Sequence, residues 1–461
     1  MIARETLQTF FRESYGQVCA LLIRRFGDMD LAQEAIQEAF LVAIDKWNDD
    51  GVPENVPGWI FAVARHKAID ILRREQLRDK KYRSLQSGQT LFSEAVQEDD
   101  FATASLSEEI PDERLRLIFT CCHPVINPES RVALTLHTLA GLTTTEIAAA
   151  FLKSEATIAQ RLVRAKRKIR DAGVPFRVPA LTEIPERLSS VLTVLYLIFN
   201  EGYSAHGGAE LMRRELCDEA IGLARMLASL MPDRSEVSAQ LALFYFQSSR
   251  IAARLDEAGR PVTLEHQDRE LWDRDRIDRG RIALRHSLRA AQAEAAAARR
   301  DSPEHGPNAR AGTPDDIASS GPYQLQARIA ASHATAATYS ETNWSRIVLY
   351  YEALYRISPT PVIRLNLAVA VAMDRGPAAG LAMLDAKDLA AELAEYHWYH
   401  LARAELLARQ IIKNGNDSQS NNDSDDDHAR ASAATAYRRA LDLCNNESEC
   451  GFIRRRLEEL G

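Results

Sequence analysis

The sequence predicts an all-α fold, and two observations support this prediction. Almost every segment with clear periodicity repeats its apolar residues at helical spacing. The alternation of apolar and polar residues that is typical of half-buried strands is scarce. The chain has 461 residues, which is enough for two to four domains with cores of their own.

Composition and the apolar segments indicate an ordinary globular protein. Hydrophobic residues make up 46% and charged residues 26% of the chain. The segment Met1–Phe11 is polar, so no signal peptide is visible, and the longest apolar run, Val191–Phe199, is too short to cross a bilayer. We therefore expect a cytoplasmic protein that has no membrane partner.

The cysteines predict neither a disulfide framework nor a metal site. No C-x-x-C pair occurs, and the side chains of Cys121, Cys122 and His123 are neighbours that would seldom converge on one ion. We expect reduced thiols, no metal and no cofactor. The six cysteines are Cys19, Cys121, Cys122, Cys217, Cys444 and Cys450.

Composition shifts divide the chain into two small helical domains and a larger one. The net charge is −8, but charge is strongly segregated along the sequence. Prolines at 175, 179 and 185 mark a boundary, and two low-complexity segments inside the largest domain are expected to be disordered. The predicted domains are 6–83, 114–173 and 181–461, with disordered insertions near 293–320 and 414–428.

The segment 84–113 is predicted to be an acidic, flexible linker. It contains eight acidic residues, no Lys or Arg, and few large apolar residues. Such a segment cannot bury enough apolar surface to offset the entropy of ordering its backbone.

The first helix with a clear surface pattern covers Asp28–Phe40. Leu31, Ala35 and Ala39 form its apolar side, and acidic residues at its start complement the helix dipole. Glu34 and Glu38 are four residues apart and share a face. Periodicity alone favours a solvated acidic face over a docking surface.

A second amphipathic helix covers Trp59–Arg74. Its apolar side includes Ile60 and Ala64, and its other side is basic. An aromatic residue beside cationic groups suits the stacking of unpaired bases and contacts with phosphates. A basic amphipathic helix with a core tryptophan is the structural alternative.

Together, the acidic helix, the Trp-led basic helix and the ending AIDILRRE resemble region 2 of extracytoplasmic-function (ECF) sigma factors. The resemblance implies that the acidic helix docks on the β′ clamp of core RNA polymerase and that the second helix captures the minus-ten promoter element. The implied polymerase-binding residues are Asp28, Asp30, Glu34, Gln37 and Glu38. The implied minus-ten residues are Asn55, Trp59, Arg65, His66, Asp70, Arg73 and Arg74.

A helix-turn-helix is predicted between Pro128 and Arg170. One helix follows Thr143, where Glu146 completes a capping box, and the next begins at Glu155. From Lys153 to Arg170 there are seven basic residues and one acidic residue, which is typical of a helix that enters the major groove. The alternative is a solvent-facing amphipathic helix.

This segment resembles sigma region 4, most strongly in TIAQRLVRAKRKIR. The resemblance implies contacts with the β flap of the polymerase and with the minus-thirty-five promoter element, and it implies that the acidic linker runs through the basic RNA channel of the polymerase. The implied DNA-contacting residues are Ser154, Glu155, Thr157, Gln160, Arg161, Arg164, Lys166 and Lys168.

The remaining chain resembles the branch of ECF factors that carries a large C-terminal extension. Segments such as YLIFNEGYSAHGG carry this resemblance. Trp344–Tyr351 and Ala433–Leu441 fit helices of tetratricopeptide-type repeats, although no regular 34-residue period is present. Degenerate helix-pair repeats with a groove for a protein or peptide, and a plain helical bundle, both remain open.

No catalytic motif is present, so we do not expect an enzyme. Glu201 with His206, or Glu265 with His266, are the nearest approach to a metal pair, but no H-E-x-x-H, phosphate loop or nucleophile elbow occurs. The expected function is a sigma factor. The alternative is a stand-alone helix-turn-helix regulator that uses the extension as a sensor.

Overall fold

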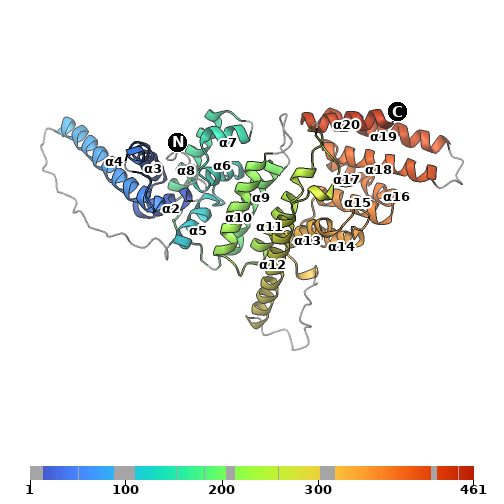
Figure 1. Ribbon diagram of the computed structural model, residues 1–461, viewed down its shortest axis with the longest axis horizontal. Coiled ribbons are helices and arrows are strands. Elements are labelled where there is room, and N and C mark those ends of the chain that lie inside the picture. The colour runs from blue at the N-terminus through green and yellow to red at the C-terminus, as the bar shows by residue number, and fades with distance from the viewer. Residues whose placement is uncertain are drawn as a thin grey trace. The chain divides into compact units, whose positions relative to one another are not determined.

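The computed structural model consists almost entirely of helices (Figure 1). It describes residues 14–49, 51–87, 110–151, 153–180, 182–203, 213–257, 259–301, 317–416, 423–444 and 446–460. Within these ranges there is one isolated β-bridge, between Leu255 and Pro261, and no strand. The prediction of an all-α fold is therefore confirmed. The chain divides into two compact units, Met1–Leu197 and Ile198–Gly461.

The first unit contains both of the small helical modules that the sequence predicts. Its helices are α2 (Tyr15–Phe26), α3 (Met29–Asp49), α4 (Val56–Ser87), α5 (Ile110–Cys121), α6 (Pro128–Thr138), α7 (Thr144–Ala150), α8 (Glu155–Asp171) and most of α9 (Ile184–Tyr203). Most of the acidic segment predicted to be a linker, residues 88–109, lies outside the described residues.

In the first module, α3 packs on α2 and α4. The apolar residues predicted for α3 are buried, and they include Leu31, Ala35 and Ala39. Ile60 and Ala64 of α4 are fully buried. One face of each helix therefore presents its small and branched side chains inward, and the charged side chains lie on the opposite face.

The second module is a capped helix-turn-helix. The backbone N–H of Thr143 donates to Glu146 Oε2 at 2.7 Å, and the backbone N–H of Glu146 donates to Thr143 Oγ1 at 3.2 Å. This reciprocal pair is the predicted capping box at the start of α7. Ser154 caps α8, because its Oγ accepts the backbone N–H of Thr157 at 3.2 Å.

The N-terminal part of α9 belongs to the first unit rather than to the extension. Ser190 Oγ donates to the backbone carbonyl of Cys122 at 2.6 Å and accepts from Arg131 at 2.8 Å. Arg187 donates to the backbone carbonyl of Phe119 at 3.1 Å. The division between the units thus falls inside α9, after the proline-rich boundary that the sequence suggests.

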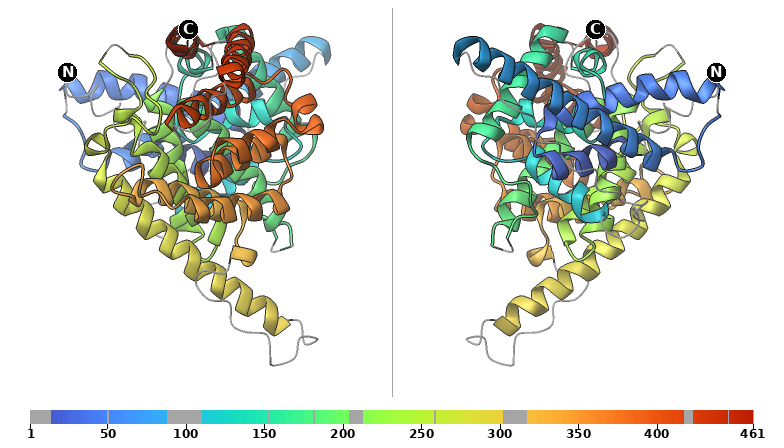
Figure 2. Two further views of the ribbon diagram at one scale, coloured as in Figure 1. Left: turned by 90° about the vertical axis from the view of Figure 1, so that its right-hand side faces the viewer. Right: turned by 90° about the vertical axis from the view of Figure 1, so that its left-hand side faces the viewer.

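The second unit is a succession of helices that pack mainly on their neighbours in the chain (Figure 2). They are α10 (Arg214–Leu230), α11 (Ser235–Ser248), α12 (Arg274–Asp301), α13 (Pro322–Thr335), α14 (Trp344–Ile357), α15 (Pro361–Arg375), α16 (Pro377–Leu384), α17 (Lys387–Glu392), α18 (His397–Asn416), α19 (Asp423–Leu443) and α20 (Glu447–Leu460), with short 3₁₀ helices at Ile251–Ala253, Arg269–Leu271 and Ile317–Ser319.

Helices extend further into the two low-complexity segments than the sequence predicts. α12 continues to Asp301, and α19 begins at Asp423. The first segment is rich in alanine, which has the highest helix propensity, and the second ends in acidic residues, which favour a helix N-terminus. Residues 302–316 and 417–422 lie outside the described parts of the chain.

Candidate polymerase and nucleic-acid interface

The acidic face of α3 is on the surface, as the sequence predicts. Asp30, Glu34 and Gln37 are exposed, whereas Asp28 and Glu38 are half-buried. Asp28 has a structural role, because its Oδ1 accepts the backbone N–H groups of Asp30 and Leu31 at the start of the helix. Glu38 forms an ion pair with Lys67 of α4 at 3.5 Å.

The start of α4 places an aromatic pair beside its basic side. The rings of Trp59 and Trp47 are 5.2 Å apart between centroids and tilted by 59°. Asn55 Oδ1 accepts the backbone N–H of Gly58 at 2.9 Å and so caps the helix. The Trp47 ring is buried and holds the half-buried Trp59 in position near the surface.

The other predicted minus-ten residues lie along the solvent side of α4. His66, Asp70 and Arg74 follow one another at intervals of four residues and are all exposed, as is Arg73. Arg65 is half-buried. This face carries cationic groups, which suit contacts with phosphates, an imidazole, which can hydrogen-bond to bases, and one carboxylate.

Along α8, some of the predicted DNA-contacting residues are exposed, and the others are half-buried and contact other residues of the protein. The exposed ones are Ser154, Glu155, Gln160, Arg164 and Lys168. Thr157 is half-buried, and its hydroxyl is 2.8 Å from that of Ser154 within the helix cap. Arg161 is also half-buried and forms an ion pair with Glu129 of α6 at 2.5 Å.

Lys166 faces the first module instead of the solvent. Its Nζ donates to Asp30 Oδ1 at 2.6 Å and to Gln33 Oε1 at 2.5 Å, and its side chain is 13% exposed. A residue predicted to grip phosphate is therefore paired with a residue predicted to bind polymerase. Gln33 has no counterpart among the residues predicted from the sequence.

A second ion pair also joins the modules. Arg24 of α2 contacts Glu113 of α5 at 2.9 Å, and the same Glu113 oxygen accepts from Arg116 at 2.8 Å. Glu113 is only 1% exposed, so its charge is shielded from water and depends on these two guanidinium groups. Hydrophobic periodicity gives no signal for such a pair, since the two partners come from different modules.

Close backbone packing accompanies these ion pairs. A Cβ atom added to Gly16 of α2 would lie 2.5 Å from the backbone oxygen of Leu139, which follows α6. Cys19 and Cys121 are fully buried in this region. Burial raises the pKa of the Cys121 thiol well above its ordinary value, and the nearby thiols of Cys122 and Cys19 raise it further. Only a residue without a side chain fits at position 16.

Two known family models match the segments of the chain that form this candidate interface. A model described as "Sigma-70 region 2" matches residues 10–78, and one described as "Sigma-70, region 4" matches residues 116–169. The first match contains α2 and α3, and the second contains α6, α7 and all but the last two residues of α8. The chain belongs to the ECF-type sigma factors.

The extension of this sigma factor matches a family whose function is unknown. That model, DUF6596, covers residues 187–288. An uncharacterized protein of Rhizobium meliloti (strain 1021) is 36% identical over 444 residues, which cover 96% of this chain and 93% of the relative. The likeness therefore includes the extension as well as both sigma regions. No solved structure gives a significant match.

In the two residue pairs considered as metal ligands in the extension, the described members contact other side chains of the protein. Glu265 forms an ion pair with Arg409, and His266 is 2.7 Å from the hydroxyl of Thr263. Glu201 pairs with Arg213, and His206 lies outside the described residues. None of the described helices is both long and apolar enough to cross a membrane.

Proposed function

We propose that this sigma factor binds core RNA polymerase in the cytoplasm and directs promoter-specific initiation of transcription. The observation that carries the proposal is the acidic face of α3, within a chain that contains both sigma regions. Glu34 and Gln37 are exposed and make no hydrogen bond or ion pair with any described residue. A surface of this kind suits docking on the basic coiled coil of the β′ clamp, while region 4 would contact the β flap.

Promoter recognition is divided between the two modules in this proposal. Trp59 and the exposed side of α4 would stack on and grip the opened minus-ten element. The first turns of α8, with Gln160 and Arg164 toward the solvent, would read the minus-thirty-five element in the major groove. A duplex-binding regulator, which is the alternative, has no use for the acidic face or for an aromatic residue that stacks on unpaired bases.

Engagement of polymerase requires the two modules to separate. We call the arrangement in which the Lys166–Asp30 ion pair joins the two modules the closed arrangement. In the initiating complex, each of these residues is expected to contact a different partner. The partners are oppositely charged, since polymerase presents a basic surface to α3 and DNA presents phosphates to α8. Core polymerase would therefore compete with Lys166 for Asp30, and promoter DNA would compete with Asp30 for Lys166.

The test is binding and transcription with purified core polymerase. Glu34→Lys combined with Glu38→Lys should weaken binding by a few kcal/mol through like-charge contacts. Glu215→Lys combined with Asp233→Lys makes the same charge change at two exposed positions of the extension and should leave binding unchanged. Equal affinity of the folded Glu34/Glu38 variant and the wild type would disprove this docking surface. Promoter binding by the chain alone, without polymerase, would favour the regulator.

The extension is proposed to regulate the sigma modules or to recruit a protein or peptide. Its helices pack in sequence order, which is the arrangement of tetratricopeptide-like repeats that form grooves. An open cavity of about 890 Å³ lies among these helices, lined by charged groups such as Arg409, Arg455 and Glu459 and by apolar groups such as Met373 and Phe452. Mixed charge and apolar surface suit a polypeptide better than a small apolar ligand.

A further inference from the structure

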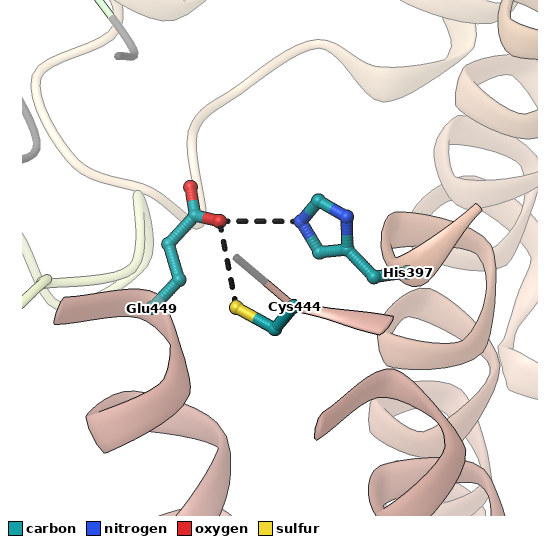
Figure 3. A group of neighbouring side chains, drawn as sticks. All are labelled: His397, Cys444 and Glu449. Atoms are coloured by element: carbon teal, nitrogen blue, oxygen red, sulfur yellow. Dashed lines mark hydrogen bonds and ion pairs between the residues drawn. The ribbon is translucent and has the colours of Figure 1, made fainter. Parts of the chain in front are cut away.

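Three side chains with metal-binding chemistry converge near the C-terminus (Figure 3). His397 is the first residue of α18, Cys444 directly follows α19, and Glu449 lies in the first turn of α20. His397 Nε2 is 3.2 Å from Glu449 Oε2, and Cys444 Sγ is 4.0 Å from the same oxygen. The three candidate ligand atoms all lie within 4.8 Å of one another.

These separations are close to those around a tetrahedral zinc ion. Zinc binds nitrogen and oxygen at about 2.0–2.2 Å and sulfur at about 2.3 Å, so its tetrahedral ligand atoms stand about 3.3–3.7 Å apart. The observed distances need to change by no more than about 1.5 Å to match. One imidazole, one thiolate and one carboxylate also form a donor set that borderline cations prefer to hard ones.

The backbone holds two of the three ligands in place without help from a metal. Asn446 is buried, and its Oδ1 accepts the backbone N–H groups of Ser448 at 3.0 Å and Glu449 at 3.2 Å. This cap fixes the start of α20 and therefore the position of Glu449. The backbone N–H of Cys444 donates to Leu441 at 3.2 Å and so continues the end of α19.

The site is partly shielded from water. The side chains of His397 and Glu449 are 20% and 11% exposed. An apolar cluster formed by the same three helices, with Tyr437 and Ile453 among its members, lies beside the site. A cation there would keep access to solvent for one water ligand but would have its protein ligands held by a packed core.

We propose that His397, Cys444 and Glu449 bind one divalent transition-metal ion of the zinc class, with water in the fourth position. Nε2 of the imidazole, the Cys444 thiolate and Glu449 Oε2 would be the ligand atoms, and the thiol would release its proton to solvent as the metal binds. The ion would tie the start of α18 to the junction between α19 and α20. It would thereby fix the last three helices of the extension relative to one another.

A hydrogen-bonded cluster is the competing explanation for the same geometry. In it, the imidazole donates to the Glu449 carboxylate, and the thiol donates either to that carboxylate or to the Asn446 carbonyl, which lies 3.4 Å from the sulfur. The two explanations differ in one measurable respect: only a metal site gives direct bonds from the sulfur to an added ion.

The experiment is a Co²⁺ titration of the full-length, chelator-treated protein under a non-thiol reductant. Reduction is needed because only the thiolate form of Cys444 binds a metal, and Cys450 is a second free cysteine near it in the chain. The expected result is one equivalent of tightly bound Co²⁺ with a thiolate-to-cobalt charge-transfer band and the visible bands of a tetrahedral ion. Added Zn²⁺ should abolish these bands by displacing the Co²⁺.

Two ligand variants and one control make the test specific. Cys444→Ser should remove the charge-transfer band, and His397→Gln should weaken binding by more than the roughly 10- to 100-fold that loss of a second-shell group costs. His397→Gln retains a group that can donate to Glu449, so the fold should survive. Cys217→Ser removes a buried thiol elsewhere in the same unit and should bind Co²⁺ like the wild type.

The proposal is overturned if reduced wild-type protein shows no charge-transfer band at one equivalent of Co²⁺. It is equally overturned if folded Cys444→Ser or His397→Gln, verified by circular dichroism, binds Co²⁺ as tightly as Cys217→Ser. These outcomes are independent of polymerase binding, so they leave the proposed sigma function untouched.

Discussion

Lys166 of the helix-turn-helix lies 2.6 Å from Asp30 of the acidic helix. The ion pair joins the two modules of the first unit, together with the Arg24–Glu113 pair and the close packing at Gly16. In the proposed function, polymerase would contact Asp30 and DNA would contact Lys166. The closed arrangement is thus held in part by the residues that its partners are proposed to use.

Removal of the Lys166 side chain should favour opening of the closed arrangement. An ion pair with one exposed partner contributes about 1 kcal/mol, so Lys166→Ala should increase the open population roughly fivefold. Cys19 and Cys121 are buried in the packed region between the modules. In Lys166→Ala, their rates of reaction with a thiol reagent should therefore rise in proportion to the open population. Peptide mass spectrometry can follow each thiol.

Lys168→Ala is the matched control, because Lys168 is on the same helix but exposed. Its labelling rate should equal that of the wild type, and Cys217 of the second unit should react at the same rate in all three proteins. Equal Cys19 and Cys121 rates in Lys166→Ala and wild type would show that the ion pair does not hold the modules together.

Arg161 and Lys168 should affect promoter recognition in different ways. If Arg161 exchanges its ion pair with Glu129 for a base contact, Arg161→Ala should change the minus-thirty-five preference and cost about 1–3 kcal/mol. Lys168→Ala should weaken all promoters alike and flatten the salt dependence. Selection from a promoter library measures both effects. An unaltered preference for Arg161→Ala would reassign this residue to phosphate contact or to structure.

The half-buried carboxyl of Glu236 should make the stability of the extension depend on pH. Its Oε2 and Oε1 accept the backbone N–H groups of Tyr323 and Gln324 at the start of α13, at 2.8 and 3.1 Å. Burial is the larger influence, and it raises the pKa of Glu236 from 4.5 to about 7. The folded state therefore binds more protons than the unfolded state between these pH values.

The sign of the effect follows from the raised pKa. The stability that the protonated carboxyl contributes is fully present below about pH 4.5 and is lost as the pH rises through about 7. The loss amounts to roughly 3 kcal/mol. Glu236→Gln does not titrate, so the difference in Tm between wild type and variant should change steadily from pH 5 to pH 8. A constant difference across this range would contradict the raised pKa.

The position of α9 predicts where the extension can be removed. A chain that ends at Val178 loses the hydrogen bonds that Arg187 and Ser190 make to the carbonyls of Phe119 and Cys122. A chain that ends at Leu197 keeps them. At about 1 kcal/mol for each bond, the longer chain should be more stable by about 2 kcal/mol or more in urea unfolding. Equal stability of the two chains would place α9 with the extension alone.

Local sequence determined the elements of the sigma modules. The apolar stripe of α3 is visible in the sequence because a helix brings residues three and four apart onto one face. The capping box of Thr143 and Glu146 is equally local, since its partners are three residues apart. Alanine-rich segments were harder to assign, and α12 runs further than the sequence predicts because helix propensity outweighed low complexity there.

Only the tertiary structure decided which of these faces meet. Lys166 lies on the polar side of its helix by periodicity, yet it is largely covered by the first module, more than a hundred residues earlier in the chain. His397 and Glu449 are likewise brought together across three helices. Such pairings depend on the packing of whole helices. Packing is set by the sum of many weak contacts between distant segments, so no local pattern of residues records it.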